Sequence, residues 1–455
     1  MKPLIKFLYI FAALLPFQFA LNIAPGFDVS IIRVAVLFLF GAMILKSFLK
    51  KDFFISANLQ SGCLILFLAI NIFSMFLVKN TEFSLRKILF LGSVFPLYFV
   101  VVDIYRDKLD KDFILKLIKW MVWGGAASFF VGMIIFLGQF IFGIDSVLGF
   151  YQKIGPFFWG NTFSLSIFNH QSFLVNVSGK NFLRLSSFFP DPHNFALFAG
   201  MVCFLALTIF LYYLKEQGSA SKTGFYGAIF LLGVMSVFLS FSRGAYLALF
   251  GGVFAVFVLG FKNKKIKKVG SSMGPDKKSL RSALAYLFFL IVLLLVFILS
   301  PARNRFIDIF SFSDGSNVGR IQIMKDGFNI FKEHFLLGVG IGNAPLYYNE
   351  DIDYRSPSNS HNTYLEIAIE SGIGGLVVWL ALLGGTILQL FRRLRSRLEE
   401  ANGLHKYLCL GLFGTLIFFA IHSVFEVFLY SPVNLSVIMI LLAVSSIILE
   451  ERCTS

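Results

Sequence analysis

The stretch that decides the fold is residues 224–268, with the sequence GFYGAIFLLGVMSVFLSFSRGAYLALFGGVFAVFVLGFKNKKIKK. It contains two apolar runs, 224–241 and 244–261, separated only by Ser242-Arg243 and followed by a basic cluster at 262–268. Each run is close to the ~20 apolar residues that a helix needs to cross a bilayer. The two runs form either a tight hairpin or one broken helix, and both alternatives place Arg243 between apolar segments.

The same type of run recurs along the whole chain. Of the 455 residues, 57% are hydrophobic and only 14% are charged, whereas soluble domains have about 45–50% apolar and ~25% charged residues. The predicted spans are 4–21, 31–49, 60–78, 88–105, 114–142, 194–214, 224–241, 244–261, 282–300, 373–391, 407–428 and 432–449. We therefore predict an all-α polytopic membrane protein with about twelve transmembrane helices.

The distribution of Lys and Arg predicts the orientation. With the loop 262–281 on the cytoplasmic side, alternating spans place 26 of the 40 Lys and Arg inside and 14 outside, as the positive-inside rule requires. Both termini are then cytoplasmic, and the net charge of +15 needs no nucleic-acid partner. Residues 1–24 also resemble a signal peptide, but the cleavage site is poor, so we expect a retained first helix.

Five segments follow from this topology. Two long loops face the outside, and the larger one is predicted to be partly helical. The segments are 1–142 (N-terminal helices), 143–193 (first long periplasmic loop), 194–300 (central helices), 301–372 (large periplasmic loop with the catalytic residues) and 373–455 (C-terminal helices).

The larger loop carries two recognisable patterns. Apolar residues recur at helical spacing over 320–336, which predicts an amphipathic helix that lies on the outer membrane face or packs in the loop without binding a ligand. The sequence GVGIGN at 338–343 is similar to a phosphate-binding loop, but it follows no strand and lacks the lysine of a P-loop. A tight turn is the favoured interpretation.

Three outer arginines are candidates for binding phosphate. Arg184 precedes the sixth span, Arg243 lies at the tip between two spans, and Arg320 opens the amphipathic stretch. An arginine presents a rigid fork of donors that matches phosphate oxygens. The alternative is that each arginine reaches lipid headgroups or a local carboxylate, an interpretation that we prefer for other outer arginines, namely Arg303, Arg305 and Arg355.

His361 is the foremost candidate among the histidines. Residues 358–366 have the sequence SNSHNTYLE, which predicts that a helix begins near His361. A histidine there can accept a proton from a sugar hydroxyl at neutral pH, or it can serve only to cap the helix. His193 is a second candidate that we interpret as structural. His422 and Glu426 are four residues apart and are expected to share a helix face, lining a cavity or pairing with each other.

The outer loops show no clear acidic pair at metal-ligand spacing. Asp351 and Asp353 flank an isoleucine and fit a solvated acidic turn. We therefore expect a site that works without a metal or another cofactor.

Three features resemble the O-antigen ligase and O-antigen polymerase superfamily of membrane glycosyltransferases. They are the Arg-x-x-x-Leu element that starts at Arg243, Arg320 near the start of the large loop, and His361-Asn362 separated by nine residues from Gly372-Ile-Gly-Gly375. The resemblance is concentrated in residues 184–376, and the first ~180 residues share only the hydrophobic pattern.

The resemblance implies a metal-independent, GT-C-like transferase in the bacterial inner membrane, with its active site on the periplasmic side. It implies a glycan donor linked to undecaprenyl diphosphate and, as acceptor, lipid A–core or a growing glycan. Arg243 and Arg320 would bind the diphosphate, with Arg184 as a third contact, and His361 would be the general base. Supporting residues would be Asn362, Gly372 and Gly375.

The glycine spacing after His361 favours a ligase over a polymerase. A ligase transfers the finished glycan to lipid A–core, and a polymerase transfers it to another lipid-linked unit. A flippase or secondary transporter is the alternative from another class, but transporters keep ionisable residues near the bilayer midplane, and the predicted helix interiors here are nearly free of charge. A non-catalytic assembly subunit is a further alternative.

Overall fold

The computed structural model describes residues 2–24, 27–52, 55–107, 110, 112–161, 163–164, 172–177, 179–214, 219–261, 291, 303, 315–349, 359–396 and 403–450. Several sequence predictions lie outside these residues: the basic cluster 262–268, almost all of the span 282–300, and Arg305, Asp351, Asp353 and Arg355.

The described elements are almost all helices. In chain order they are α1 (Lys2–Leu14), η1 (Leu15–Phe17), β1 (Ala20–Ala24), β2 (Phe27–Ser30), α2 (Ile31–Lys50), α3 (Leu59–Ser74), η2 (Met75–Leu77), α4 (Thr81–Val94), α5 (Pro96–Arg106), α6 (Phe113–Phe142), α7 (Ile144–Trp159), β3 (Leu174–Val177), β4 (Lys180–Leu183), α9 (Pro192–Tyr212), α10 (Ala220–Leu239), α11 (Arg243–Phe261), α14 (Gly315–Glu333), α15 (Ala344–Tyr348), α16 (Thr363–Ser396), α17 (Gly403–His422) and α18 (Pro432–Glu450).

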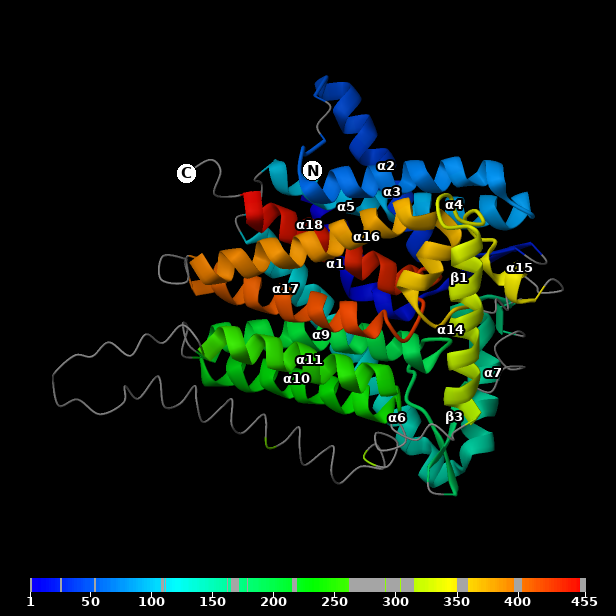
Figure 1. Ribbon diagram of the computed structural model, residues 1–455. Helices are drawn as coiled ribbons and strands as arrows, with labels where there is room; N and C mark the ends of the chain where they lie inside the picture. The colour runs from blue at the N-terminus through cyan, green and yellow to red at the C-terminus, as the bar shows by residue number, and fades with distance from the viewer. Residues whose placement is uncertain are drawn as a thin grey trace.

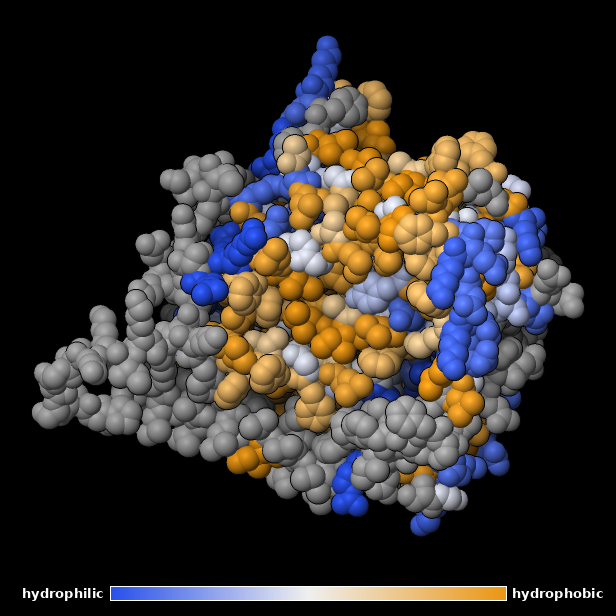
Figure 2. Space-filling model, in the orientation of Figure 1, coloured by the Kyte–Doolittle hydropathy of each residue, from blue (hydrophilic) through white to orange (hydrophobic). Residues whose placement is uncertain are grey.

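Within the described residues, eight helices are long and apolar enough to cross a membrane, and α3 and the apolar part of α11 are shorter apolar helices. The long helices lie side by side as a bundle (Figure 1). Apolar residues cover the visible flank of this bundle as a broad band (Figure 2). The prediction of a polytopic helical membrane protein is therefore confirmed, whereas the count of twelve stays a prediction.

The structure adds two pairs of short strands that the all-α prediction lacks. Strands β1 and β2 pair antiparallel, as do β3 and β4. Each pair is a short hairpin next to a long helix, so the fold class is unchanged.

Several helix boundaries differ from the predicted spans. Helix α1 ends at Leu14, before Pro16, because proline cannot continue the backbone ladder of a helix. The runs 224–241 and 244–261 form a hairpin and not one broken helix: α10 ends at Leu239, Phe241 takes a left-handed φ of 52°, and α11 begins at Arg243.

The amphipathic stretch of the large loop is helix α14, which starts at Gly315. It crosses the ends of the long helices at a steep angle (Figure 1) and packs on α16 and α15. Gly327 faces Ile369 and Leu365 of α16, whereas Val318, Ile321 and Phe328 expose their side chains. The helix thus packs against the bundle on one side and keeps an apolar flank exposed on another.

Candidate active site

Arg184 and His193 lie together at the N-terminal end of α9. Arg184 is only 7% exposed, and it donates from Nε to the Ser240 carbonyl (2.8 Å) and from Nη1 to the Ser172 carbonyl (3.2 Å). Both Nη atoms are also 3.2 Å from His193 Nε2. Because arginine can only donate, we assign Nε2 of His193 as an acceptor and place its hydrogen on Nδ1, which lies 3.0 Å from Ser242 Oγ.

Glu426 is the centre of the cluster. Its Oε1 accepts from Arg320 Nη2 (3.0 Å) and lies 3.3 Å from His193 Nδ1, and its Oε2 lies 3.4 Å from His361 Nδ1. Burial raises the pKa of the Glu426 carboxyl, but the neighbouring His193, Arg320 and His361 outweigh burial and hold the pKa well below its usual range. The carboxylate is therefore ionised at neutral pH and connects three side chains from distant parts of the chain.

Asp191 shows the opposite electrostatic balance. Burial and the nearby Glu426 carboxylate raise the pKa of Asp191, although Arg184 and backbone donors partly offset this. Its carboxylate caps α9 by accepting from the Asn194 backbone N–H at 2.9 Å. This cap fixes the start of α9, and with it the position of His193.

His361 presents one ring nitrogen to Glu426. In a neutral ring, a hydrogen on Nδ1 can donate to this carboxylate, and Nε2 is then the acceptor nitrogen. The backbone of His361 has a φ of 50°, which is uncommon and strained for a residue with a side chain. Strain of this kind persists only where the surroundings hold it, and here Asn359 Oδ1 accepts from the His361 N–H (3.0 Å).

The first turn of α16 is bound to the turn that carries Glu426. Asn362 Oδ1 accepts from the N–H groups of Tyr364 and Leu365 at 2.9 and 3.0 Å, which is helix N-capping. The Thr363 N–H donates to the Ser423 carbonyl (2.8 Å), and its hydroxyl donates to the Glu426 carbonyl (2.7 Å). The supporting role expected for Asn362 thus has a local basis: it starts the helix that places His361 opposite Glu426.

Arg243 begins α11 beside the same cluster. It follows Ser242, whose hydroxyl contacts His193, and it is followed by Gly244. A Cβ on Gly244 would lie only 2.6 Å from Phe425 Cβ. The glycine therefore allows the start of α11 to approach the 423–426 turn, which places the half-buried Arg243 close to the Glu426 cluster.

Gly372 breaks α16 in the middle. Its φ is 63° and its ψ is −167°, and a Cβ there would lie 2.3 Å from the Leu336 carbonyl oxygen. Only glycine adopts this conformation without strain. A Cβ on Gly375 would lie 2.3 Å from the Cβ of Ser371, four residues earlier in α16. Both glycines therefore shape the break in α16, and neither is among the contacts of the Glu426 cluster.

The sequence at 338–343 is a packed turn and not a phosphate loop. All six backbone N–H groups already have acceptors in the protein: four donate to backbone carbonyl oxygens, and the other two donate to Ser74 Oγ and Glu370 Oε1, both at 3.0 Å. A phosphate-binding loop needs free N–H groups. The interpretation as a tight turn is confirmed.

The structure brings Arg184, Arg320 and His361 to one end of the bundle, next to the start of α11. Sequence reasoning missed Glu426 as the connecting residue and treated His193 as structural. The expectation that His422 and Glu426 share a helix face is wrong, because α17 ends at His422 and the chain turns there. The His422 ring stacks on Phe418 instead. An acidic residue just beyond a helix end, opposite several basic residues, was the available signal.

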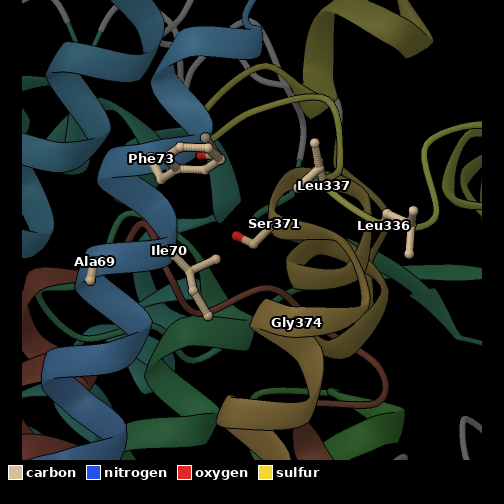
Figure 3. Close-up of a pocket in the computed structure, with 8 residues that line it drawn as sticks. Ala69, Ile70, Phe73, Leu336, Leu337, Ser371 and Gly374 are labelled. Atoms are coloured by element: carbon tan, nitrogen blue, oxygen red, sulfur yellow. The ribbon is translucent and has the colours of Figure 1, made fainter.

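A cavity of about 300 Å³ lies elsewhere, at the break of α16. Figure 3 shows it between α3 and α16, with Leu336 and Leu337 on one side and Ser371 directed inward. Its lining includes no charged side chain, so it does not suit a diphosphate. Among the described residues, no group of three or more His, Cys, Asp or Glu is placed to hold a metal ion.

Comparison with known proteins points to one family. Residues 228–380, which include Arg243, Arg320 and His361, match the family model described as O-antigen ligase. The chain is also 23% identical over 369 residues to the teichuronic acid biosynthesis protein TuaE of Bacillus subtilis (strain 168). That alignment covers 77% of this chain but 64% of the relative, so the chain spans less than two thirds of the relative's length. Both matches confirm the predicted resemblance to the O-antigen ligase and polymerase superfamily, and they support an enzyme of the membrane glycosyltransferase type.

Proposed function

We propose that this chain, whose residues 228–380 match the O-antigen ligase family, transfers a glycan from undecaprenyl diphosphate to an acceptor hydroxyl at the outer face of the bacterial inner membrane. The observation that carries the proposal is the contact of His361 Nδ1 with the ionised Glu426, beside Arg320. It joins a base and cationic groups at one end of a membrane bundle.

The base is Nε2 of His361. With Nδ1 donating to Glu426, Nε2 is free to accept the proton of the acceptor hydroxyl as the new glycosidic bond forms. The Glu426 carboxylate fixes the ring and stabilises the imidazolium that results. Such a base contributes about 10²–10⁴-fold to a rate.

The leaving diphosphate is stabilised by arginine. Negative charge develops on the diphosphate as the bond to the anomeric carbon breaks, and preorganised cations lower the barrier without reorganising. Arg243 is our first candidate for this role, since it is half-buried at the edge of the cluster. Arg320 is 27% exposed and uses one Nη on Glu426, so other donors stay available for phosphate oxygens.

Arg184 is better placed to position His193 than to touch the diphosphate. Its Nε and both Nη atoms already have partners, and its side chain is buried. We therefore revise its role from a third phosphate contact to support of the cluster.

The acceptor is the least constrained part of the proposal. We favour lipid A–core, as in a ligase, because of the glycine spacing after His361. The second candidate, transfer to a growing glycan, is favoured by the relative named for teichuronic acid biosynthesis. Direct displacement predicts inversion at the anomeric carbon, and a product with retained configuration would exclude this mechanism.

The test uses purified protein in nanodiscs with an undecaprenyl-diphosphate oligosaccharide, either with lipid A–core or alone. Wild type, His361→Ala and Arg243→Ala are compared with a control variant, Arg86→Ala, which removes an exposed arginine of α4 that pairs with Glu82. A glycan-modified lipid A–core that both site variants fail to make identifies a ligase, and longer glycans on the polyprenyl lipid identify a polymerase. Absence of both products with wild type would contradict the proposal and favour a transporter.

A further inference from the structure

A second charged cluster is buried in the bundle and is connected to the candidate site by hydrogen bonds. Lys87 of α4 and Glu370 of α16 are 1% and 2% exposed, and Lys87 Nζ lies 2.7 Å from both carboxylate oxygens. Removing two charges from water is costly and is offset only by good geometry and further hydrogen bonds. Both residues lie just outside the predicted spans 88–105 and 373–391 but within the longer helices α4 and α16, and this buried pair needs an explanation.

The third N–H group of Lys87 starts a series of hydrogen bonds that extends to the residue before His361. Lys87 Nζ donates to the Tyr430 hydroxyl at 3.0 Å, and Tyr430 donates to Glu366 Oε1 at 3.1 Å. Because an ammonium can only donate, the direction of both bonds is fixed. Glu366, which is fully buried, uses Oε2 to accept the Ser360 backbone N–H at 3.1 Å.

This chain of hydrogen bonds ends one residue before His361. Ser360 precedes the strained left-handed residue, and Asn362 follows it as the helix cap. Such a backbone conformation persists only where the surrounding structure holds it. Glu366 supplies the bond on the N-terminal side, and the Glu426 turn supplies those on the C-terminal side through Thr363.

We propose that Lys87 is a positioning residue for His361, acting through Tyr430 and Glu366. This inference rests on the proposed function, in which His361 is the base. Lys87 orders the Tyr430 hydroxyl, Tyr430 orders Glu366, and Glu366 holds Ser360 so that the His361 ring meets Glu426. Loss of this order moves Nε2 away from the acceptor hydroxyl, while the arginines that bind the donor stay in place.

The cleanest perturbation is Tyr430→Phe. The Lys87 ammonium lies 4.2 Å from the centre of the Tyr430 ring, so phenylalanine keeps the cation–π contact and the Lys87–Glu370 pair. Only the hydroxyl is removed, and with it the bond from Lys87 and the bond to Glu366. Lys87→Met is harsher because it leaves two buried carboxylates without their cation, and the double variant Lys87→Met/Glu370→Gln removes the pair together.

Matched controls are available at the other end of the bundle. Tyr98 is a buried tyrosine whose hydroxyl donates to Asn58 Oδ1 at 3.0 Å. Lys46 and Asp103 form a largely buried pair at 2.7 Å. Tyr98→Phe and Lys46→Met/Asp103→Asn therefore remove comparable interactions without touching the network that leads to His361.

The experiment measures transfer kinetics and amide hydrogen exchange on the full-length variants in nanodiscs. For Tyr430→Phe we expect kcat to fall at least tenfold with the donor KM changed less than threefold, a shifted pH–rate profile, and exchange in residues 359–363 at least tenfold faster. Tyr98→Phe should match wild type in all four readouts.

The outcomes separate the two proposals. If wild type transfers glycan and His361→Ala does not, but Tyr430→Phe matches wild type, the positioning role is overturned and the proposed function stands. If wild type transfers nothing, the proposed function fails, and unchanged exchange in residues 359–363 then overturns the positioning role independently. Equal losses in kcat for Tyr430→Phe and Tyr98→Phe would also overturn it, since the effect would then be one of general stability.

Discussion

Glu426→Gln tests whether the His361–Glu426 contact sets the proton on the histidine. The change keeps the size of the side chain and replaces one carboxylate oxygen with an NH2 group. Arg320 and the Nδ1–H of His193 are donors, so the amide oxygen is expected to face them. The NH2 group then faces His361 Nδ1, 3.4 Å away in the wild type.

The histidine must respond by changing its tautomer. Nδ1 becomes the acceptor, and Nε2 carries the hydrogen and no longer works as a base. The rate should therefore fall by the whole contribution of a general base, about 10²–10⁴-fold in kcat. Since both residues act as one unit, His361→Ala/Glu426→Gln should be no slower than His361→Ala alone.

The assay is single-turnover transfer of a labelled glycan from undecaprenyl diphosphate in nanodiscs, with saturating acceptor. Donor affinity is measured separately, because the arginines are unchanged and Kd should shift little. A Glu426→Gln enzyme within threefold of the wild-type rate would refute the tautomer argument. Multiplicative losses in the double variant would refute it as well, because they would show that the two residues act independently.

The remaining predictions concern binding, stability and pH. Arg243→Ala should raise the donor KM at least tenfold, and Arg243→Lys should recover only part of the loss because lysine lacks the planar fork; equal KM values would contradict its phosphate role. Arg184→Ala should lower stability by about 3 kcal/mol, since two buried carbonyls lose a charged donor, which thermal unfolding in detergent measures. Gly372→Ala should destabilise by about 1–3 kcal/mol because alanine is strained at a φ of 63°, whereas Gly384→Ala on the same helix, with open space around it, should be neutral. Because the pKa of Glu426 is lowered in the folded protein, its ionised carboxylate stabilises the fold at any pH above the ordinary carboxyl pKa of about 4.3, and this stabilisation is lost as the pH falls through the lowered pKa. Wild type should therefore unfold at a higher temperature than Glu426→Gln at pH 7. The difference in unfolding temperature should narrow below about pH 4.

Part of the site could be predicted from local sequence. The start of α16 near His361 follows from Asn362, whose side chain bonds to backbone groups only two and three residues away. The packed turn at 338–343 was predictable from what it lacks, a preceding strand and a lysine. The hairpin at Arg243 was one of two alternatives, because hydropathy is the same whether the chain turns back or kinks.

The partners of those residues could not be predicted in the same way. Glu426 is 65 residues from His361 and 106 from Arg320, and Lys87 is 283 from Glu370. No periodicity or motif connects residues at such separations. The burial of Arg184 depends equally on which helix ends meet.

The sequence by itself determined that the chain is a bundle of membrane helices, because a bilayer demands long apolar segments whose backbone groups bond within the helix. It also located the polar segments between these helices and singled out the arginines and the histidine that they contain. Only the tertiary structure decided that Glu426 contacts Arg320, His193 and His361, and that the buried Lys87 is linked to the residue before His361 through hydrogen bonds. The physical reason is that hydropathy and helix capping act over a few residues, whereas a buried charge must find its partner across the assembled bundle.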